Sequence, residues 1–165
     1  MTEMEMQRTI SVLVKNRPRV LARVAGLFAR RGFNIDSLAV STTESEAISR
    51  MTVATTCDLP TLRQIAKQVL KLHDVVRVID HSESNIVERE LCLIKVEVER
   101  GQRAELISLC DVFRGDIVDI GNGTVMVQLV GDKDKIDAFV DVMADYEIAE
   151  MVRSGKIVLD RGGQG

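Results

Sequence analysis

A change in hydrophobic period is the feature that most restricts how the start of this chain can fold. In residues 9–15, TISVLVK, the apolar Ile10, Val12 and Val14 alternate with other side chains, which predicts a strand with one buried face. The next apolar positions follow helical spacing and predict one buried stripe: Val20, Leu21, Val24, Leu27 and Phe28. Gly32 then stands where a glycine commonly ends a helix.

The following segments complete one βαββαβ unit. Residues 34–42 and 48–55 have the composition of strands and are joined by a short polar turn. Asp58 and Pro60 are typical of the start of a helix, and residues 75–80, VVRVID, supply a fourth strand. In a single antiparallel sheet covered by two helices, this order is the ferredoxin-like arrangement.

The second half of the chain repeats this order after a polar stretch, residues 81–90, which we interpret as a linker. The elements expected there are a strand at 91–99, a helix at 106–113 that ends at Gly115, a hairpin of strands at 116–120 and 124–130, a helix opened by Asp132, and a strand near 146–151. The sequence therefore predicts an α+β protein of two ferredoxin-like domains in tandem, residues 1–80 and 91–165.

A sheet with helices on one face leaves its edge strands unpaired. The strand at 34–42 is expected at such an edge, with Leu38 and Val40 available for contact. Pairing with the same edge of another copy would satisfy its free backbone groups. We therefore expect a homodimer.

Composition restricts the classes of function. The formal net charge of −3 argues against a protein that coats nucleic acid. Cys57, Cys92 and Cys110 have no paired spacing and are interpreted as reduced core thiols. No apolar run has the length of a signal peptide or a membrane span, so we expect a cytoplasmic protein without a membrane partner.

Catalytic equipment is sparse. His73 and His81 are interpreted as solvated or helix-end residues, and no phosphate-binding or nucleophile motif occurs. Three acidic residues at 132, 134 and 137 are better explained by the dipole of a helix start than by a metal. A small one-sided sheet of this kind indicates a binding or regulatory module rather than an enzyme.

The segment from Lys15 to Ile35 carries the candidate binding site. A helix start after a strand presents unpaired amides and favours an anion such as a carboxylate. Asn16 and Asn34 flank the helix, and a dimer could bring Asn34 of one copy toward Asn16 of the other. The residues alone leave an alternative open, in which Asn16 caps the helix and Asn34 is a turn residue.

A resemblance to a known family decides between these interpretations. SVLVKNRPRVLARVAGLFARRGFNIDSLAV, followed by SRMTV, QIAKQVLKLHDVVRV, VERELCLIKV, FRGDIVDI and VRSGKIVLDRG, resembles the small regulatory subunit of acetolactate synthase (acetohydroxyacid synthase). The likeness extends from residue 9 to about residue 162. It implies an N-terminal ACT domain and a C-terminal ferredoxin-like (ACT-like) domain.

The resemblance also implies a function and a site. Such a subunit has no activity of its own and holds no cofactor. It binds the large catalytic subunit, which uses thiamine diphosphate, Mg and FAD, raises its activity, and confers feedback inhibition by valine. Effector contacts carried over from the family are Asn16, Arg19, Val20, Leu21, Asn34 and Ile35.

Arg19 departs from the family pattern, which usually has glycine at this position because glycine accepts torsions that other residues avoid. The guanidinium could turn to solvent or pair with the effector's carboxylate, or it could fill the site and weaken inhibition, which we favour.

Two further alternatives remain open. The basic residues from Lys15 to Arg31 form either a solvated helix face, which is favoured, or a docking surface for the catalytic subunit. The rival function is an amino-acid-sensing module of another enzyme or of a transcription regulator. A fused regulator of that kind would need a helix-turn-helix or a catalytic domain, and we expect the two units to leave no residues for one.

Overall fold

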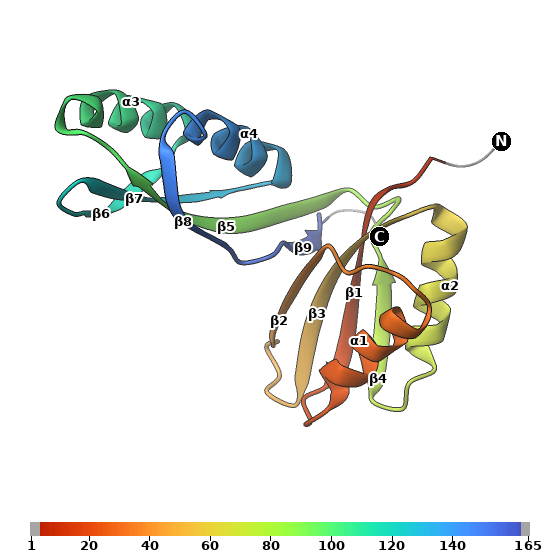
Figure 1. Cartoon of the computed structure of the whole chain (residues 1–165). Coiled ribbons are helices and arrows are strands. Elements are labelled where there is room, and N and C mark those ends of the chain that lie inside the picture. Colours follow the sequence, from red (N-terminus) through yellow and green to blue (C-terminus); the bar gives the residue numbers. More distant parts are fainter. Residues whose placement is uncertain (1–3, 163–165) are drawn as a thin grey trace. The chain divides into compact units, whose positions relative to one another are not determined.

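The computed structural model describes residues 4–162 and divides the chain into two units (Figure 1). The N-terminal unit comprises Met1–Val87 together with Ile157–Gly165, and the C-terminal unit comprises Glu88–Lys156. Each unit has its own hydrophobic core.

The N-terminal unit follows the predicted order of elements. Its members are β1 (Met6–Lys15), α1 (Val20–Arg30), β2 (Ser37–Thr42), β3 (Ile48–Cys57), α2 (Leu59–Leu70) and β4 (Val75–Asp80). The four strands form an antiparallel sheet in the order β2-β3-β1-β4, so β2 is an edge strand as predicted. Both helices cover the same face of this sheet (Figure 1).

The predicted core of this unit is largely confirmed. Ile10, Val12 and Val14 point to the helices and are buried, together with Val24 and Phe28 of α1. The prediction for Leu21 was wrong, because its side chain is 43% exposed. Leu21 lies beside Val20 at the edge of the buried face of α1. Helical spacing alone therefore predicted a buried stripe that is one residue too wide.

The helix boundaries confirm the predicted signals. The Asp58 carboxylate accepts a hydrogen bond from the Thr61 amide at 2.7 Å and so caps α2, with Pro60 in its first turn. Gly32, with φ of 72°, provides the left-handed residue after α1.

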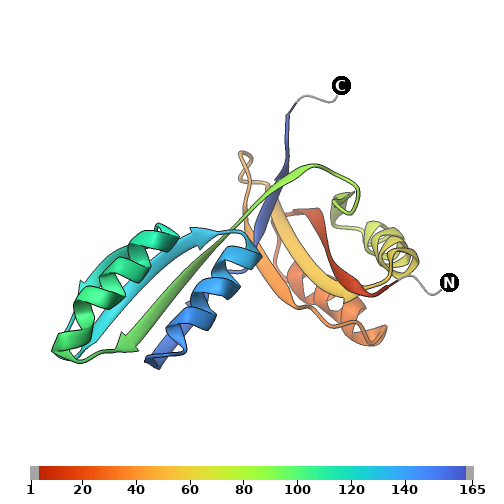
Figure 2. The same cartoon turned by 90° about the horizontal axis from the view of Figure 1, so that it is seen from above.

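The C-terminal unit repeats the fold. Its members are β5 (Ile86–Glu97), the short 3-10 helix η1 (Arg100–Gln102), α3 (Arg103–Phe113), β6 (Asp116–Ile120), β7 (Thr124–Gly131), α4 (Lys133–Met143) and β8 (Glu147–Arg153). The sheet order β6-β7-β5-β8 reproduces that of the first unit. Both views show α3 and α4 on one face of it (Figures 1 and 2).

One element differs from the sequence prediction, and the end of α3 shows two details that were not predicted. β5 begins at Ile86, inside the stretch interpreted as a linker. The left-handed residue after α3 is Arg114, with φ of 56°, rather than Gly115. Gly115 is instead needed for close packing, since an added Cβ would lie 3.3 Å from the carbonyl oxygen of Gln128.

A further strand, β9 (Ile157–Asp160), was not predicted. It belongs to the N-terminal unit, where Arg50 donates a hydrogen bond to the Val158 carbonyl at 3.1 Å. Four residues are too few to show a period, which explains the omission.

The three cysteines are free and buried, and burial raises the pKa of each thiol. No helix in residues 4–162 is long and apolar enough to cross a membrane.

Candidate functional site

The loop from Asn16 to Arg19 joins β1 to α1 and is held by hydrogen bonds to the β2–β3 turn. The Asn16 amide donates to the Ala47 carbonyl at 2.8 Å, and its side-chain Nδ2 donates to the Glu46 carbonyl at 2.9 Å. Asn16 is therefore not the helix cap, and that alternative was wrong. Its amide side chain still has an oxygen and a second N–H for a ligand.

Arg19 occupies the cap position with a left-handed backbone. Its φ is 71° and its ψ is −4°, which for a residue with a Cβ costs about 1–2 kcal/mol. This is the conformation that glycine adopts freely. The structure thus gives a physical reason for the expectation that glycine fits this position better, and it leaves the Arg19 side chain exposed.

The start of α1 is favourable for an anion. The helix has no side-chain cap and no acidic residue in its first turn. Its first amides therefore lack the usual internal acceptor and carry the positive end of the helix dipole. A ligand carboxylate could accept their hydrogen bonds.

Two of the nearby arginines are already paired. Arg23 donates to the Asp74 carboxylate at 2.8 Å, and Arg17 lies 4.0 Å from the same group. Both side chains are nevertheless exposed, 63% for Arg17 and 57% for Arg23, which agrees with the interpretation as a solvated surface. A docking role for the remaining basic residues stays a prediction.

Asn34 and Ile35 lie at the far end of α1. Asn34 Nδ2 donates to Asp36 at 2.8 Å, and its carbonyl accepts a hydrogen bond from Thr55 at 2.6 Å. Ile35 is half-buried against the N-terminal core. A helix of 11 residues is about 16 Å long, so one chain does not bring Asn34 to Asn16.

The remaining predicted contacts differ in exposure. Val20 is 3% exposed and belongs to the core, so its own backbone amide is better placed for a ligand than its side chain. Leu21 is accessible. The effector roles of all six residues stay predictions.

Sequence reasoning missed the groups that fix the loop. Glu46 and Ala47 act through their carbonyl oxygens, and Asp74 acts from the turn before β4. Backbone contacts of this kind leave no composition signal. For Asp74 the only signal in the sequence was an acidic residue in a turn, which could pair with one of the arginines near the start of the first helix.

The interpretation of His81 as solvated was wrong. Its side chain is 1% exposed, and its two ring nitrogens lie 2.8 Å from Ser11 Oγ and 2.9 Å from the Asp160 carboxylate. This resembles a serine–histidine–aspartate triad. Ser11 is fully buried, so no substrate can reach the hydroxyl, and the three residues serve to attach β9.

No group of three or more histidine, cysteine or acidic residues in the described part of the chain could hold a metal ion. Two ferredoxin-like units in tandem, the first with an uncapped helix start, are the arrangement expected of ACT-domain regulatory proteins. A family model described as an AHAS small subunit-like ACT domain matches residues 10–77, and one described as the small subunit of acetolactate synthase matches residues 89–162.

Relatives agree over nearly the whole length. The chain is 47% identical over 159 residues to a probable acetolactate synthase small subunit of Archaeoglobus fulgidus, covering 96% of this chain and 99% of the relative. It is 43% identical to the acetolactate synthase small subunit of Mycobacterium leprae, covering 95% and 93%.

A solved structure agrees as well. The crystal structure of the acetolactate synthase small subunit from Thermotoga maritima aligns with a TM-score of 0.89 and 35% identity, covering 96% of this chain and 99% of that one. The chain belongs to the acetolactate synthase small-subunit family. It is a regulatory subunit with an ACT domain, and this membership implies a large catalytic subunit as its partner.

Proposed function

We propose that this chain raises the activity of an acetolactate synthase catalytic subunit and makes that activity sensitive to valine. The single observation that carries the proposal is the start of α1, where uncapped amides, Asn16 and a left-handed residue 19 lie together. Valine is a zwitterion, so it needs donors for its carboxylate and an acceptor for its ammonium group.

In the proposed site the carboxylate takes hydrogen bonds from the first amides of α1. The side-chain oxygen of Asn16 accepts from the ammonium group, because Asn16 Nδ2 is already used by Glu46. The exposed Leu21 offers an apolar contact for the isopropyl group.

The site is completed by a second copy. Asn34 is about one helix length from Asn16 within a chain, so an effector that contacts both must lie between two chains. The edge strand β2, with Val40 exposed, supplies the unpaired backbone groups for such a homodimer.

Thiamine diphosphate, Mg and FAD are assigned to the catalytic partner, and this subunit is proposed to hold none of them. The test is an assay with pyruvate, thiamine diphosphate, Mg and FAD, with each subunit alone and mixed. We expect no product from this chain alone and a higher turnover of the catalytic subunit in the mixture. Turnover by this chain without the partner would contradict the proposal.

Arg19 is proposed to weaken the response to valine. Its exposed side chain extends from the residue just before the first amides of α1, where the ligand is proposed to bind. We expect Arg19→Gly to bind valine roughly fivefold to tenfold more tightly, because the long side chain no longer competes with the ligand at the helix start; this corresponds to about 1 kcal/mol of binding free energy. Calorimetry on both proteins measures this difference, and equal affinities would count against it.

A further inference from the structure

A buried carboxylate stands at the start of α1, in the turn that leads from α2 to β4. The side chain of Asp74 is only 9% exposed. Burying a carboxylate is unfavourable unless cations and hydrogen bonds compensate it. Asp74 therefore requires its partners to stay in place.

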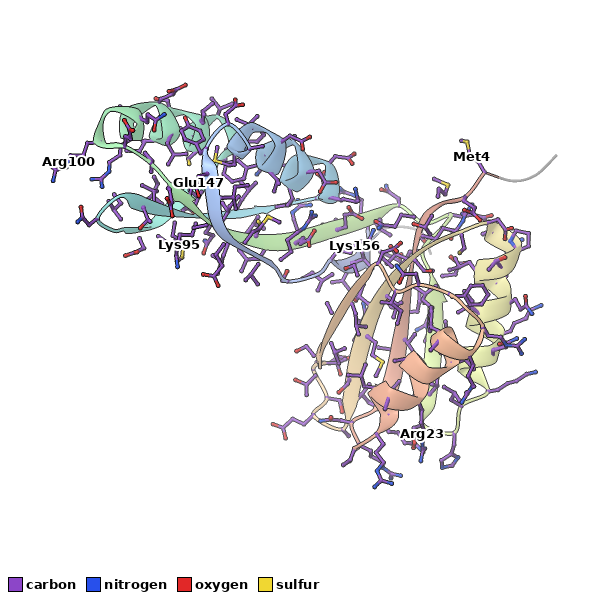
Figure 3. The ribbon with its side chains drawn as sticks, viewed as in Figure 1. Met4, Arg23, Lys95, Arg100, Glu147 and Lys156 are labelled. Atoms are coloured by element: carbon purple, nitrogen blue, oxygen red, sulfur yellow. The ribbon has the colours of Figure 1, made fainter. Side chains whose placement is uncertain are left out.

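Contacts of Asp74 lie on both sides of the 16–19 loop. Before the loop, the Lys15 amide donates to the backbone carbonyl of Asp74 at 2.8 Å, a contact that does not involve the carboxylate. After it, Arg23 Nη1 donates to Asp74 Oδ2 at 2.8 Å, and within it Arg17 Nη1 lies 4.0 Å from Oδ1. Figure 3 shows Arg23 at the end of the unit where α1 begins.

The loop between these contacts contains the strained residue. Arg19 has a φ of 71°, and a left-handed torsion at a residue with a Cβ persists only where the flanking structure fixes it. Asn16 is tied to Glu46 and Ala47 on one side of the loop. Asp74 provides the ties to the other side.

We propose that Asp74 is a positioning residue that holds the loop, with Arg19 left-handed, in the conformation that directs the first amides of α1 outward. Without the carboxylate, Arg23 is released and Arg19 can relax to an ordinary torsion. The amides of residues 20–22 would then turn away from the ligand. Only the consequence for valine rests on the proposed function, because the loop's conformation is measurable without any ligand.

The experiment compares Asp74→Asn, Arg19→Gly and the double variant by amide hydrogen exchange of Asn16, Arg17 and Arg23, whose amides are hydrogen-bonded to Ala47, Lys15 and Arg19. Asp74→Asn should speed exchange about tenfold, which is the loss expected for one hydrogen bond to a charged group. In the Arg19→Gly background the same change should have a smaller effect, about threefold, because glycine keeps the torsion without help.

A matched control is Glu83→Gln, which removes an acid of the same unit whose ion pair with Arg63, at 3.2 Å, is exposed. It should leave exchange of the Asn16, Arg17 and Arg23 amides unchanged. If Asp74→Asn does not fold, Arg23→Gln removes the other partner at an exposed position and should give the same pattern.

Valine calorimetry on the same proteins gives the functional readout. In the Arg19→Gly background, Asp74→Asn should weaken valine binding severalfold. Exchange that is no faster than in the Glu83→Gln control, or an equal effect in both Arg19 backgrounds, would overturn the proposal. If exchange behaves as expected and valine binds to none of the proteins, the positioning role holds and the valine proposal fails.

Discussion

The two units share one strand order and differ at the start of their first helix. α1 begins after a left-handed arginine with no side-chain cap. α3 follows directly on η1, whose start is capped by a capping box of Glu99 and Gln102, and Glu105 places a carboxylate in the first turn of α3. The same topology thus leaves the helix start without a side-chain cap or an acidic residue in one unit and provides both in the other, so the loop rather than the fold creates the site.

The faces opposite the helices differ as well. In the N-terminal unit this face carries small buried side chains, including Thr9, Ser11 and Thr52, and Ser11 contacts His81. In the C-terminal unit Lys95 and Glu150 form an ion pair on this face, on which Lys95 points away from the helices (Figure 3). Apolar side chains surround the pair there: Leu93, Met126 and Val152.

The largest expected effect tests whether the two cores are separate. Phe139→Ala empties a fully buried position and removes its edge-to-face contact with Phe113, whose ring centroid is 5.3 Å away. We expect a loss of about 3–5 kcal/mol in the stability of the C-terminal unit. Phe28→Ala is the matched change in the N-terminal unit. Hydrogen exchange during urea unfolding locates each loss, and a loss spread evenly over both units would contradict two separate cores.

The second effect concerns the ion-pair network around Arg153 in the C-terminal unit. Arg153 donates to both oxygens of Glu90, at 3.0 and 2.8 Å, and to Asp137 at 2.7 Å. Arg153→Met leaves the buried Glu90 uncompensated and should cost about 3 kcal/mol, measured by urea denaturation. Lys95→Gln, in the more exposed pair with Glu150, is the control and should cost about 0.5 kcal/mol or less.

A third comparison uses the two left-handed arginines. Glycine removes a strain of about 1–2 kcal/mol at either position and loses about 0.4–1 kcal/mol through the freer unfolded chain. Arg19→Gly and Arg114→Gly should therefore each stabilise the protein by roughly 0.5–1 kcal/mol in thermal or urea unfolding. Only Arg19→Gly should alter valine binding. A valine effect of Arg114→Gly would weaken the distinction between the units.

The smallest expected effect is a local pH response of β9. The hydrogen bond from His81 holds the pKa of the Asp160 carboxyl below its usual value. A lowered pKa in the folded state stabilises the attachment of β9 above about pH 4, and this contribution is lost as the pH falls through the lower folded value. Exchange of the β9 amides between about pH 5 and pH 2.5 should show this loss. Asp160→Asn should make exchange insensitive to pH once intrinsic rates are corrected.

Much of the fold was predictable because its signals are local. The alternation of Ile10, Val12 and Val14 and the cap at Asp58 each specify an element through neighbours in the chain. Leu21 was predicted incorrectly and the left-handed Arg114 was not foreseen, since the exposure of a helix rim and the choice of left-handed residue depend on what packs against them. The burial of His81 depends on Asp160, which is 79 residues away.

The candidate site divides in the same manner. Asn16, Arg19 and Asn34 could be named from the sequence because they flank one predicted helix, and Asn16 and Asn34 match the pattern of the family resemblance. Their effector roles stay predictions, and the contacts that hold the loop, through Glu46 and Asp74, were not foreseen.

By itself the sequence determined the order of strands and helices, the two repeated units and the family. It could do so because periodicity, capping and turn chemistry act over a few residues. Only the tertiary structure decided that Arg19 is left-handed, that Asp74 is buried beside it, and that β9 returns to the N-terminal unit. Those features arise from contacts between residues far apart in the chain. The free energies of such contacts cannot be inferred from local sequence patterns.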